Sequence, residues 1–472
     1  MKVILINPPS KNEILSCNPD FINKERGHNP PLGLLYLAAY IEKFSNFEIK
    51  VLDCQVEELN YEQIAEFLTK EKPDVIGMTA MTFTLIDVLE VVKIAKKINL
   101  QTKIVLGGTH PFIYPEETIN LPGIDYLILG EGEISFLELL KHLDKKTSEP
   151  PKNIKGLVFK LGNEVVKTGL GDLLMDLDQL PFPARHLTPY QKYTSLLAKK
   201  NPTTTMITSR GCPYRCIFCD RPNLGKVFRA RSAKNVVDEM EGCEKMGINE
   251  ILMYDDTFTV NRQRVLDICT EYQKRGLKVA WDIRARVDTV NEEMLKELKK
   301  SNCQRIHYGI EAGTERILKV LRKGITLEQI ERAFKLTKKA GIPTLGYFMI
   351  GNPEETREDI MATIKFAKKI KPDFVQITIT TPFPRTDLYE LGLQKGILKE
   401  DYMRKFAQNP TDKFEIRYWE ENFNKEELNN LLTYAYKSFY WRPSFLIKEL
   451  FQIRSLSELK KKLKAGLSLL AR

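Results

Sequence analysis

The sequence predicts an α/β protein with a doubly wound parallel sheet, a partial (β/α)6 TIM-like barrel and a helical C-terminal extension. Two observations support this fold class. Short apolar runs alternate with amphipathic helical segments before residue 150 and again after residue 200. Residues 151–200 interrupt this alternation with a hairpin and a proline-bearing linker. We therefore expect domains at 1–150, 201–400 and 401–472, with 151–200 as a connector.

The first region alternates from its start. We expect strands at 2–7, 47–53, 75–79, 103–106 and 126–129, and helices at 31–41, 61–70, 85–98 and 134–143. Ligands of such sheets bind beyond the carboxyl ends of the strands. Those ends carry Asn7-Pro8-Pro9, Thr79-Ala80-Met81-Thr82, Gly107-Gly108-Thr109-His110 and Gly130-Glu131-Gly132-Glu133. The glycines allow close approach to a large ligand, although tight turns would also explain each of them. The absence of G-x-G-x-x-G after the first strand argues against a dinucleotide.

The second region resumes the alternation. We expect strands at 203–208, 250–254, 279–283, 305–309, 344–350 and 374–380, and helices at 233–246, 262–275, 291–300, 327–340 and 357–370. Capping signals agree, with Ser232 and Thr326 at helix starts and Gln329 completing a capping box. Chemistry on such barrels gathers at the carboxyl ends of the strands.

Three cysteines lie within eight residues, at Cys212, Cys216 and Cys219. Thiolates bind iron–sulfur clusters or zinc, and a structural zinc site normally has four protein ligands. No fourth ligand is evident, because the next cysteine, Cys243, lies 24 residues after Cys219. The spacing favours a [4Fe–4S] cluster with one open iron over zinc or a purely structural site. The other cysteines, Cys17, Cys54, Cys243, Cys269 and Cys303, are too scattered for a disulfide framework.

The composition indicates which broad class of protein this is. Hydrophobic residues at 43% and charged residues at 28% are typical of a globular protein. The net charge of +10 is modest, and we see no basic stripe interleaved with aromatic residues. Binding of nucleic acid is therefore not expected. Because no signal peptide or membrane span is evident, we expect a cytoplasmic protein.

Near the C-terminus, a basic amphipathic helix is expected. Its leucines are Leu456, Leu459, Leu463, Leu467 and Leu470, interleaved with Lys460, Lys461, Lys462 and Lys464. Such a helix either contacts an anionic membrane surface peripherally or packs on the barrel with its lysines solvated.

At the cysteines, the sequence resembles the radical S-adenosylmethionine (SAM) superfamily, whose signature is C-x3-C-x-aromatic-C. Cys212, Cys216, Phe218 and Cys219 match that signature. The resemblance implies that the open iron chelates SAM and that reductive cleavage releases methionine and a 5′-deoxyadenosyl radical. It also implies an electron donor such as a flavodoxin or ferredoxin.

The resemblance extends to the strand ends, where it implies SAM contacts. Gly309-Ile310-Glu311-Ala312-Gly313 resembles G-[IV]-E-[SA]-G, and Gly351-Asn352-Pro353-Glu354-Glu355-Thr356 resembles G-x-P-G-E-T with Glu354 in place of glycine. The implied SAM contacts are Phe218, Asp255, Asp256, Arg286, Gly309, Glu311, Gly351 and Pro353. A helix cap is an alternative role for the two aspartates, and a structural salt bridge for Arg286. Arg221, Arg229 and Arg231 follow the cysteines and could balance an anionic cluster or bind an acidic group of the substrate. Solvated loop arginines are more frequent, so we expect these three to be solvated.

The first region resembles the cobalamin-binding domain of the B12-dependent branch of this superfamily. Pro31-Leu32-Gly33-Leu34, Gly107-Gly108-Thr109-His110-Pro111 and Gly130-Glu131-Gly132-Glu133 carry the likeness. The implied cobalamin contacts are Asn7, Thr79, Met81, Gly107, Gly108, Thr109, His110, Gly130, Glu131, Gly132 and Glu133. The D-x-H-x-x-G motif is not matched, since Asp53 is followed by Cys54-Gln55, so a lower histidine ligand from that motif is not expected. We expect His28 and His110 to be hydrogen-bonded loop residues.

Together these features predict a cobalamin-dependent radical SAM enzyme. We expect it to methylate an unactivated carbon of a small-molecule or lipid-like substrate, with oxidative cyclisation or ring rearrangement as the alternative. A methylthiotransferase is disfavoured, because the N-terminal region has only Cys17 and Cys54 for a second cluster. Two other hypotheses are an iron–sulfur protein of electron transfer or redox sensing, and a radical enzyme whose first domain binds no cobalamin. No side chain is predicted as catalytic acid or base.

Overall fold

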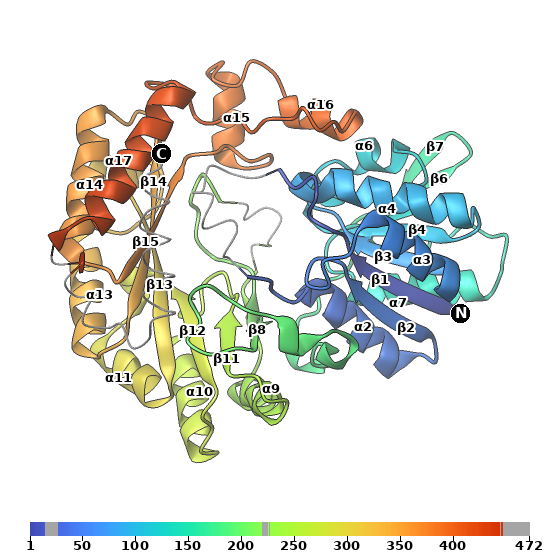
Figure 1. Ribbon diagram of the computed structural model, residues 1–472, viewed down its shortest axis with the longest axis horizontal. Coiled ribbons are helices and arrows are strands. Elements are labelled where there is room, and N and C mark those ends of the chain that lie inside the picture. The colour runs from blue at the N-terminus through green and yellow to red at the C-terminus, as the bar shows by residue number, and fades with distance from the viewer. Residues whose placement is uncertain (15–26, 220–224, 226, 444, 447–472) are drawn as a thin grey trace.

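The computed structural model describes residues 1–14, 27–219, 225, 227–443 and 445–446. Two large sheets dominate the fold, and Figure 1 shows them side by side. The first has seven strands in the order β2-β1-β3-β4-β5-β6-β7. Their bounds are β1 Lys2–Asn7, β2 Glu48–Asp53, β3 Val75–Thr79, β4 Lys103–Gly107, β5 Tyr126–Ile128, β6 Leu157–Leu161 and β7 Glu164–Lys167. Strands β1 to β5 pair in parallel, whereas β6 and β7 are antiparallel, so the hairpin expected in the connector extends this sheet.

Helices cover both faces of the first sheet. Residues of α2 (Leu32–Phe44) and α7 (Glu133–Asp144) pack on one face, and residues of α3 (Tyr61–Glu71) and α4 (Leu85–Ile98) pack on the other. The short helices α5 (Thr109–Ile113) and α6 (Pro115–Asn120) follow β4. A capping box of Asn60 and Gln63 fixes the start of α3. The predicted doubly wound sheet is confirmed.

The second sheet contains six parallel strands in sequence order, from β8 to β15, and it curls without β8 pairing with β15. The strands are β8 Thr203–Met206, β11 Glu250–Met253, β12 Ala280–Ala285, β13 Cys303–Glu311, β14 Thr344–Ile350 and β15 Phe374–Ile379. The helices between them are α9 Ala233–Lys245, α10 Arg262–Lys274, α11 Glu292–Lys300, α12 Glu315–Val320, α13 Leu327–Lys339 and α14 Arg357–Ile370. The predicted partial barrel is confirmed, as are the caps at Ser232 and Thr326.

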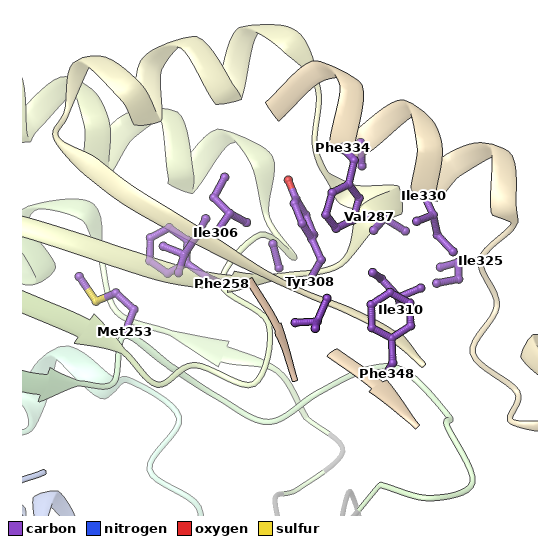
Figure 2. Packing of buried hydrophobic residues seen from close by; sticks show 14 of the residues in the cluster. Met253, Phe258, Val287, Ile306, Tyr308, Ile310, Ile325, Ile330, Phe334 and Phe348 are labelled. Atoms are coloured by element: carbon purple, nitrogen blue, oxygen red, sulfur yellow. The ribbon is translucent and has the colours of Figure 1, made fainter. Parts of the chain in front are cut away.

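Alternation along the strands separates the two faces of this sheet. Ile306, Tyr308 and Ile310 of β13 are buried and pack with Phe334 and Ile330 of α13 (Figure 2). The residues that alternate with them, such as Arg305 and His307, therefore lie on the opposite, concave face. A hydrophobic core thus lies between sheet and helices, and the concave face is left for polar groups.

Three helices follow the second sheet: α15 (Asp387–Gln394), α16 (Tyr402–Gln408) and α17 (Lys425–Tyr440). Helix α17 packs along β15, and α16 packs on α6 of the first region. In the described part of the chain, no helix is long and apolar enough to cross a membrane. The predicted basic helix at 456–470 lies outside the described residues.

Candidate functional site

Residues 211–228, which carry the three cysteines, form a loop that we call the cysteine loop. This loop begins and ends in a narrow neck. Two short antiparallel strands, β9 (Ser209–Arg210) and β10 (Arg229–Ala230), pair at this neck. Gly211 has φ +89°, and a Cβ there would lie 2.3 Å from the carbonyl oxygen of Val227, so only glycine fits. Asp255 fixes the strand that leads into the neck, because its carboxylate accepts from Thr208 N, Thr208 Oγ1 and Ser209 Oγ, each at 2.6 Å.

The three thiols of the loop are half-buried and free of disulfides. Burial raises the pKa of Cys216, and burial together with the charges of Cys216 and Cys212 raises the pKa of Cys219 to about 12. Among the described residues, no three His, Cys, Asp or Glu side chains converge to hold a single metal ion as they stand. In an iron–sulfur cluster each thiolate binds its own iron, so the thiols need not converge on one atom.

Charged side chains at the ends of β12 and β13 and after α12 act on the thiol of Cys216. Glu311, at the end of β13, has φ +73° and is paired with Lys323 Nζ at 2.7 Å. The guanidinium of Arg286 lies 3.7 Å from the centroid of the Tyr214 ring, within the cysteine loop, and pairs with Asp288 at 3.0 Å. Lys323 and Arg286 both lower the pKa of Cys216, against the larger effect of burial.

Other predicted SAM contacts lie at the same strand ends. Phe218 packs against the barrel core, with Lys323 Nζ 5.8 Å from its ring centroid. Asp256 accepts from the backbone N–H of Gly211, and desolvation and the charge of Asp255 raise its pKa to about 6. A Cβ at Gly309 would lie 2.6 Å from Glu311 Oε1 and 2.8 Å from Lys323 Nζ. That glycine therefore makes room for the ion pair.

The turn after β14 departs from its family pattern at one position. Gly351 has φ +73°, and a Cβ there would lie 2.7 Å from Leu428 Cδ2. Glu354, which stands where the pattern has glycine, also has a positive φ, of +61°. Its side chain is exposed, whereas Pro353 before it is buried. The backbone thus keeps the shape that glycine favours, at a cost in strain of order 1–3 kcal/mol.

The rim of the first sheet is partly open. Gly130 has φ +90° and nothing within 4 Å of a Cβ built on it, and Met81 is 49% exposed. A Cβ at Gly107 would meet only Ile128 O at 3.9 Å, whereas one at Gly108 would lie 2.9 Å from Ala80 O. Thr79, Thr109 and Gly132 are half-buried, and Asn7 Nδ2 donates to Asp53 Oδ1 at 2.7 Å.

His110 is fully buried at this rim. Its Nδ1 lies 3.0 Å from Thr82 Oγ1, and its Nε2 has no partner among the described residues. Burial lowers its pKa to about 4, which keeps the ring neutral. The histidine is thus hydrogen-bonded, as predicted, but it lies in α5 and not in a loop.

The turn after β5 joins the first sheet to the neck of the cysteine loop. Glu131 forms a two-pronged ion pair with Arg229, and Glu133 Oε1 lies 2.5 Å from Arg210 Nη2. The expectation of solvated arginines is wrong for two positions: Arg229 and Arg231 are 5% and 4% exposed, and Arg231 pairs with buried Glu239. Arg221 lies outside the described residues. No local sequence pattern signals these pairs.

A buried charged layer crosses the concave face near the amino ends of the strands. Arg305 contacts Asp282 Oδ2 at 2.7 Å and Glu250 Oε1 at 3.2 Å, and donates to Leu197 O at 2.6 Å. His307 lies 3.1 Å from Asp282 Oδ2 and 2.8 Å from Tyr347 Oη. Burial alone would raise the pKa of Asp282, but the bond with His307 and the charge of Arg305 hold it at about 2. No sequence motif marks this layer.

The residues present fit the cofactors that the motifs imply. Three soft thiol donors suit an iron–sulfur cluster with one iron left free of protein. Beside them, Glu311, Lys323, Arg286 and Asp256 place charges of both signs, which suits the zwitterionic end of SAM. On the other sheet, Gly107 and Gly130 leave backbone open to the flat face of a large ligand. These arrangements define a radical SAM enzyme with a second cofactor domain.

Comparisons with known proteins agree with this class of enzyme. The model of the radical SAM superfamily matches residues 206–367, and that of the B12 binding domain matches residues 21–140. An uncharacterized methyltransferase of Pyrococcus horikoshii is 38% identical over 456 residues, which are 96% of this chain and 95% of that protein. The anaerobic magnesium-protoporphyrin IX monomethyl ester cyclase of Rubrivivax gelatinosus is 32% identical over 78% of this chain and 67% of its own length.

Among solved structures, the cobalamin-dependent SAM radical enzyme OxsB, with aqua-cobalamin and SAM bound, superposes with a TM-score of 0.75. It is 20% identical, and the match covers 99% of this chain and 72% of that one, so it shows a shared fold. The chain therefore belongs to the cobalamin-binding branch of the radical SAM superfamily. It is an enzyme whose cofactors are a [4Fe–4S] cluster, SAM and cobalamin.

Proposed function

We propose that this enzyme transfers a methyl group from SAM, by way of cobalamin, to an unactivated carbon of a small molecule. The contact of the Gly130-Glu131-Gly132-Glu133 turn with the neck of the cysteine loop supports this most directly. It brings the rim of the first sheet next to the loop that holds the three thiols. A methyl group carried at that rim and a radical generated at the loop would then act in one shared space. The Pyrococcus relative, which is called a methyltransferase, supports the same reaction.

The residues can be given roles within this proposal. Cys212, Cys216 and Cys219 would hold the cluster, which when bound and reduced would supply the electron for the cleavage of SAM. Lys323 and Arg286 orient the carboxylate of SAM, and Glu311 and Asp256 accept from its ammonium group. The open backbone at Gly107 and Gly130 and the exposed Met81 form the cobalamin surface, with Asn7, Thr79 and Thr109 at its edge. Gly309, in β13, and Gly351, directly after β14, would border the adenosyl part of SAM.

Asp255 has a different role from the one that the resemblance implies. Its two oxygens are already occupied by Thr208 and Ser209, so we assign it to fixing the loop rather than to binding SAM. We propose a flavodoxin or ferredoxin as the partner that supplies the electron. We also propose that the reaction takes place in the cytoplasm. A lipid-like substrate and a peripheral membrane contact depend on residues 456–470, outside the described residues.

The test is product analysis with the anaerobically reconstituted full chain, supplied with SAM, hydroxocobalamin and a chemical reductant. Methyl transfer predicts both S-adenosylhomocysteine, from methylation of cobalamin, and 5′-deoxyadenosine, from radical formation. Cys216→Ala removes one cluster ligand and should abolish 5′-deoxyadenosine. Cys243→Ala, a buried cysteine of α9, is the matched control and should retain it. If the reconstituted wild type forms neither product, the proposal is wrong.

Oxidative cyclisation is the second candidate, favoured by the likeness to the Rubrivivax cyclase. The same assay separates the two reactions. A cyclase would form 5′-deoxyadenosine without S-adenosylhomocysteine, because its cobalamin would not carry a methyl group taken from SAM.

A further inference from the structure

The neck of the cysteine loop brings two arginines face to face. Arg210 of β9 is paired directly with Arg229 of β10, and residues 211–228 run between them. Like charges directly opposite each other on neighbouring strands destabilise their pairing. The side chain of Arg229 is 3% exposed and that of Arg210 is 17% exposed, so water screens their repulsion weakly. The neck therefore requires anionic partners to close.

The anionic partners come from the other sheet. Glu131 Oε1 lies 2.6 Å from Arg229 Nη2 and 3.2 Å from Arg210 Nη1, so one carboxylate bridges both arginines. Glu133 adds a second carboxylate, on Arg210 alone. Burial acts to raise the pKa of Glu131, but the bond from Arg229 and the charges of both arginines lower it. Glu131 is thus ionised at neutral pH, and its negative charge compensates the positive charges of the two arginines at the neck.

The backbone around this contact is fixed from both sides. Leu174, between the hairpin and the barrel, donates its N–H to Glu131 Oε2 at 3.2 Å and accepts from Arg229 Nη1 at 2.8 Å. Glu133 is the first residue of α7, whose buried face packs on the first sheet. Glu133 therefore stands on a rigid element, with Glu131 two residues before it, whereas the strands that they hold are two residues each.

We infer that Glu131 and Glu133 are positioning residues for the iron–sulfur cluster: they close the neck of the loop that carries Cys212, Cys216 and Cys219. The first domain is then part of the cluster site as well as a cofactor domain. This assigns the two glutamates to the cysteine loop, whereas the family resemblance implies that they contact cobalamin. The inference holds for methyl transfer and for cyclisation alike.

Glu131→Gln in the full chain tests this inference, because it removes the charge and keeps the shape. After anaerobic reconstitution, the first measurement is the rate at which a ferrous-iron chelator bleaches the cluster absorbance. Breaking a buried ion pair is strongly destabilising, so we expect cluster loss to be at least about tenfold faster. The second measurement, the affinity for hydroxocobalamin by equilibrium dialysis, should change little. Glu57→Gln, which breaks the pair between Glu57 of the first domain and Lys192 of the connector (2.9 Å), is the control and should leave both unchanged.

A double variant separates positioning from general damage. Glu131→Gln/Arg229→Gln also removes one of the two opposed arginines, so its cluster should survive longer than that of Glu131→Gln alone. Loss of hydroxocobalamin affinity with an unaffected cluster would instead make Glu131 a cobalamin contact. An unchanged cluster in Glu131→Gln, or equal loss in the single and double variants, would also overturn the inference. Neither measurement requires turnover, so the outcome does not depend on the proposed reaction.

Discussion

Glu355, in the turn after β14, has an unusual pair of carboxyl oxygens. Oε2 accepts from Asn352 N at 2.8 Å and from Asn352 Nδ2 at 3.1 Å, whereas Oε1 is buried without a partner among the described residues. Burial raises the pKa of this carboxyl from 4.5 to about 7, despite the bonds from Asn352. A buried polar atom without a partner favours the neutral form of its group.

This predicts how Glu355→Gln changes stability with pH. Because the pKa is higher in the folded state, the folded protein binds more protons between about pH 4.5 and 7, and the free energy of unfolding falls as pH rises through that window. Glutamine stays neutral, so at pH 8 the variant should gain about 1–3 kcal/mol relative to the wild type. At pH 4.5 the gain should vanish. Urea unfolding at both pH values measures this. Glu358→Gln, on the exposed start of α14, should show no gain at pH 8, and an equal difference at both pH values would contradict the prediction.

At the scale of elements, α17 protects an open sheet edge. Strand β15 is the last of its sheet and presents unpaired backbone groups on one side. Tyr436 Oη lies 3.0 Å from both N and O of Ile377, and Tyr440 Oη lies 3.0 Å from both N and O of Val375. Two tyrosines one turn apart thus bond residues two apart on the strand. The tyrosines of α17 thus bond backbone groups of β15 that a seventh strand would otherwise pair with.

Removing these hydroxyls should lower the stability of the protein, because backbone groups at the sheet edge lose their partners. Tyr436→Phe and Tyr440→Phe each leave a backbone N–H and C=O without a partner, which should cost about 1–3 kcal/mol per variant. Tyr434→Phe, whose ring is 47% exposed, is the control and should change stability little. Chemical unfolding of the three variants checks this. Equal stability of all three would show that water replaces the hydroxyls.

Sequence patterns predicted the elements well where the signal was local. Val75–Thr79, Leu85–Ile98 and Arg357–Ile370 have the bounds that their periodicity and capping residues predicted. The neck strands were missed, because two residues in each of two distant segments form no periodic pattern. Arg229 was expected in solvent for a related reason. Its partner Glu131 lies 98 residues away in the chain, and no local pattern encodes that contact.

At the scale of the molecule, the first region and the barrel meet in a second place. Tyr114 and α6 of the first region pack with Tyr389, Tyr402 and Met403 of α15 and α16. Tyr389 Oη donates to Asp401 Oδ1 at 2.7 Å, whereas the buried Tyr114 Oη has no partner in the part of the chain that the structure describes. The two regions are therefore held both at the cysteine neck and at this aromatic cluster.

Tyr114 and Tyr389, two of the three tyrosines of this cluster, should respond oppositely to loss of their hydroxyls. Tyr114→Phe removes an unpaired buried group and should be neutral or stabilising, whereas Tyr389→Phe loses a bond to a carboxylate and should cost about 1.5–3 kcal/mol. Thermal unfolding of both variants checks this, and equal destabilisation would contradict it. Each substitution keeps the ring, so the packing of the cluster serves as its own control.

The charged layer of Glu250, Arg305, Asp282 and His307 has a kinetic consequence. These side chains are buried and bonded across β11, β12 and β13, and Lys199 donates its backbone N–H to Glu250 Oε2 at 3.0 Å from below. A layer so fully bonded blocks passage through that end of the barrel. Molecules would then come and go only at the opposite end, past the cysteine loop. Within each half of the reaction, the molecule that lies deepest must then bind first and leave last, so binding should be ordered rather than random.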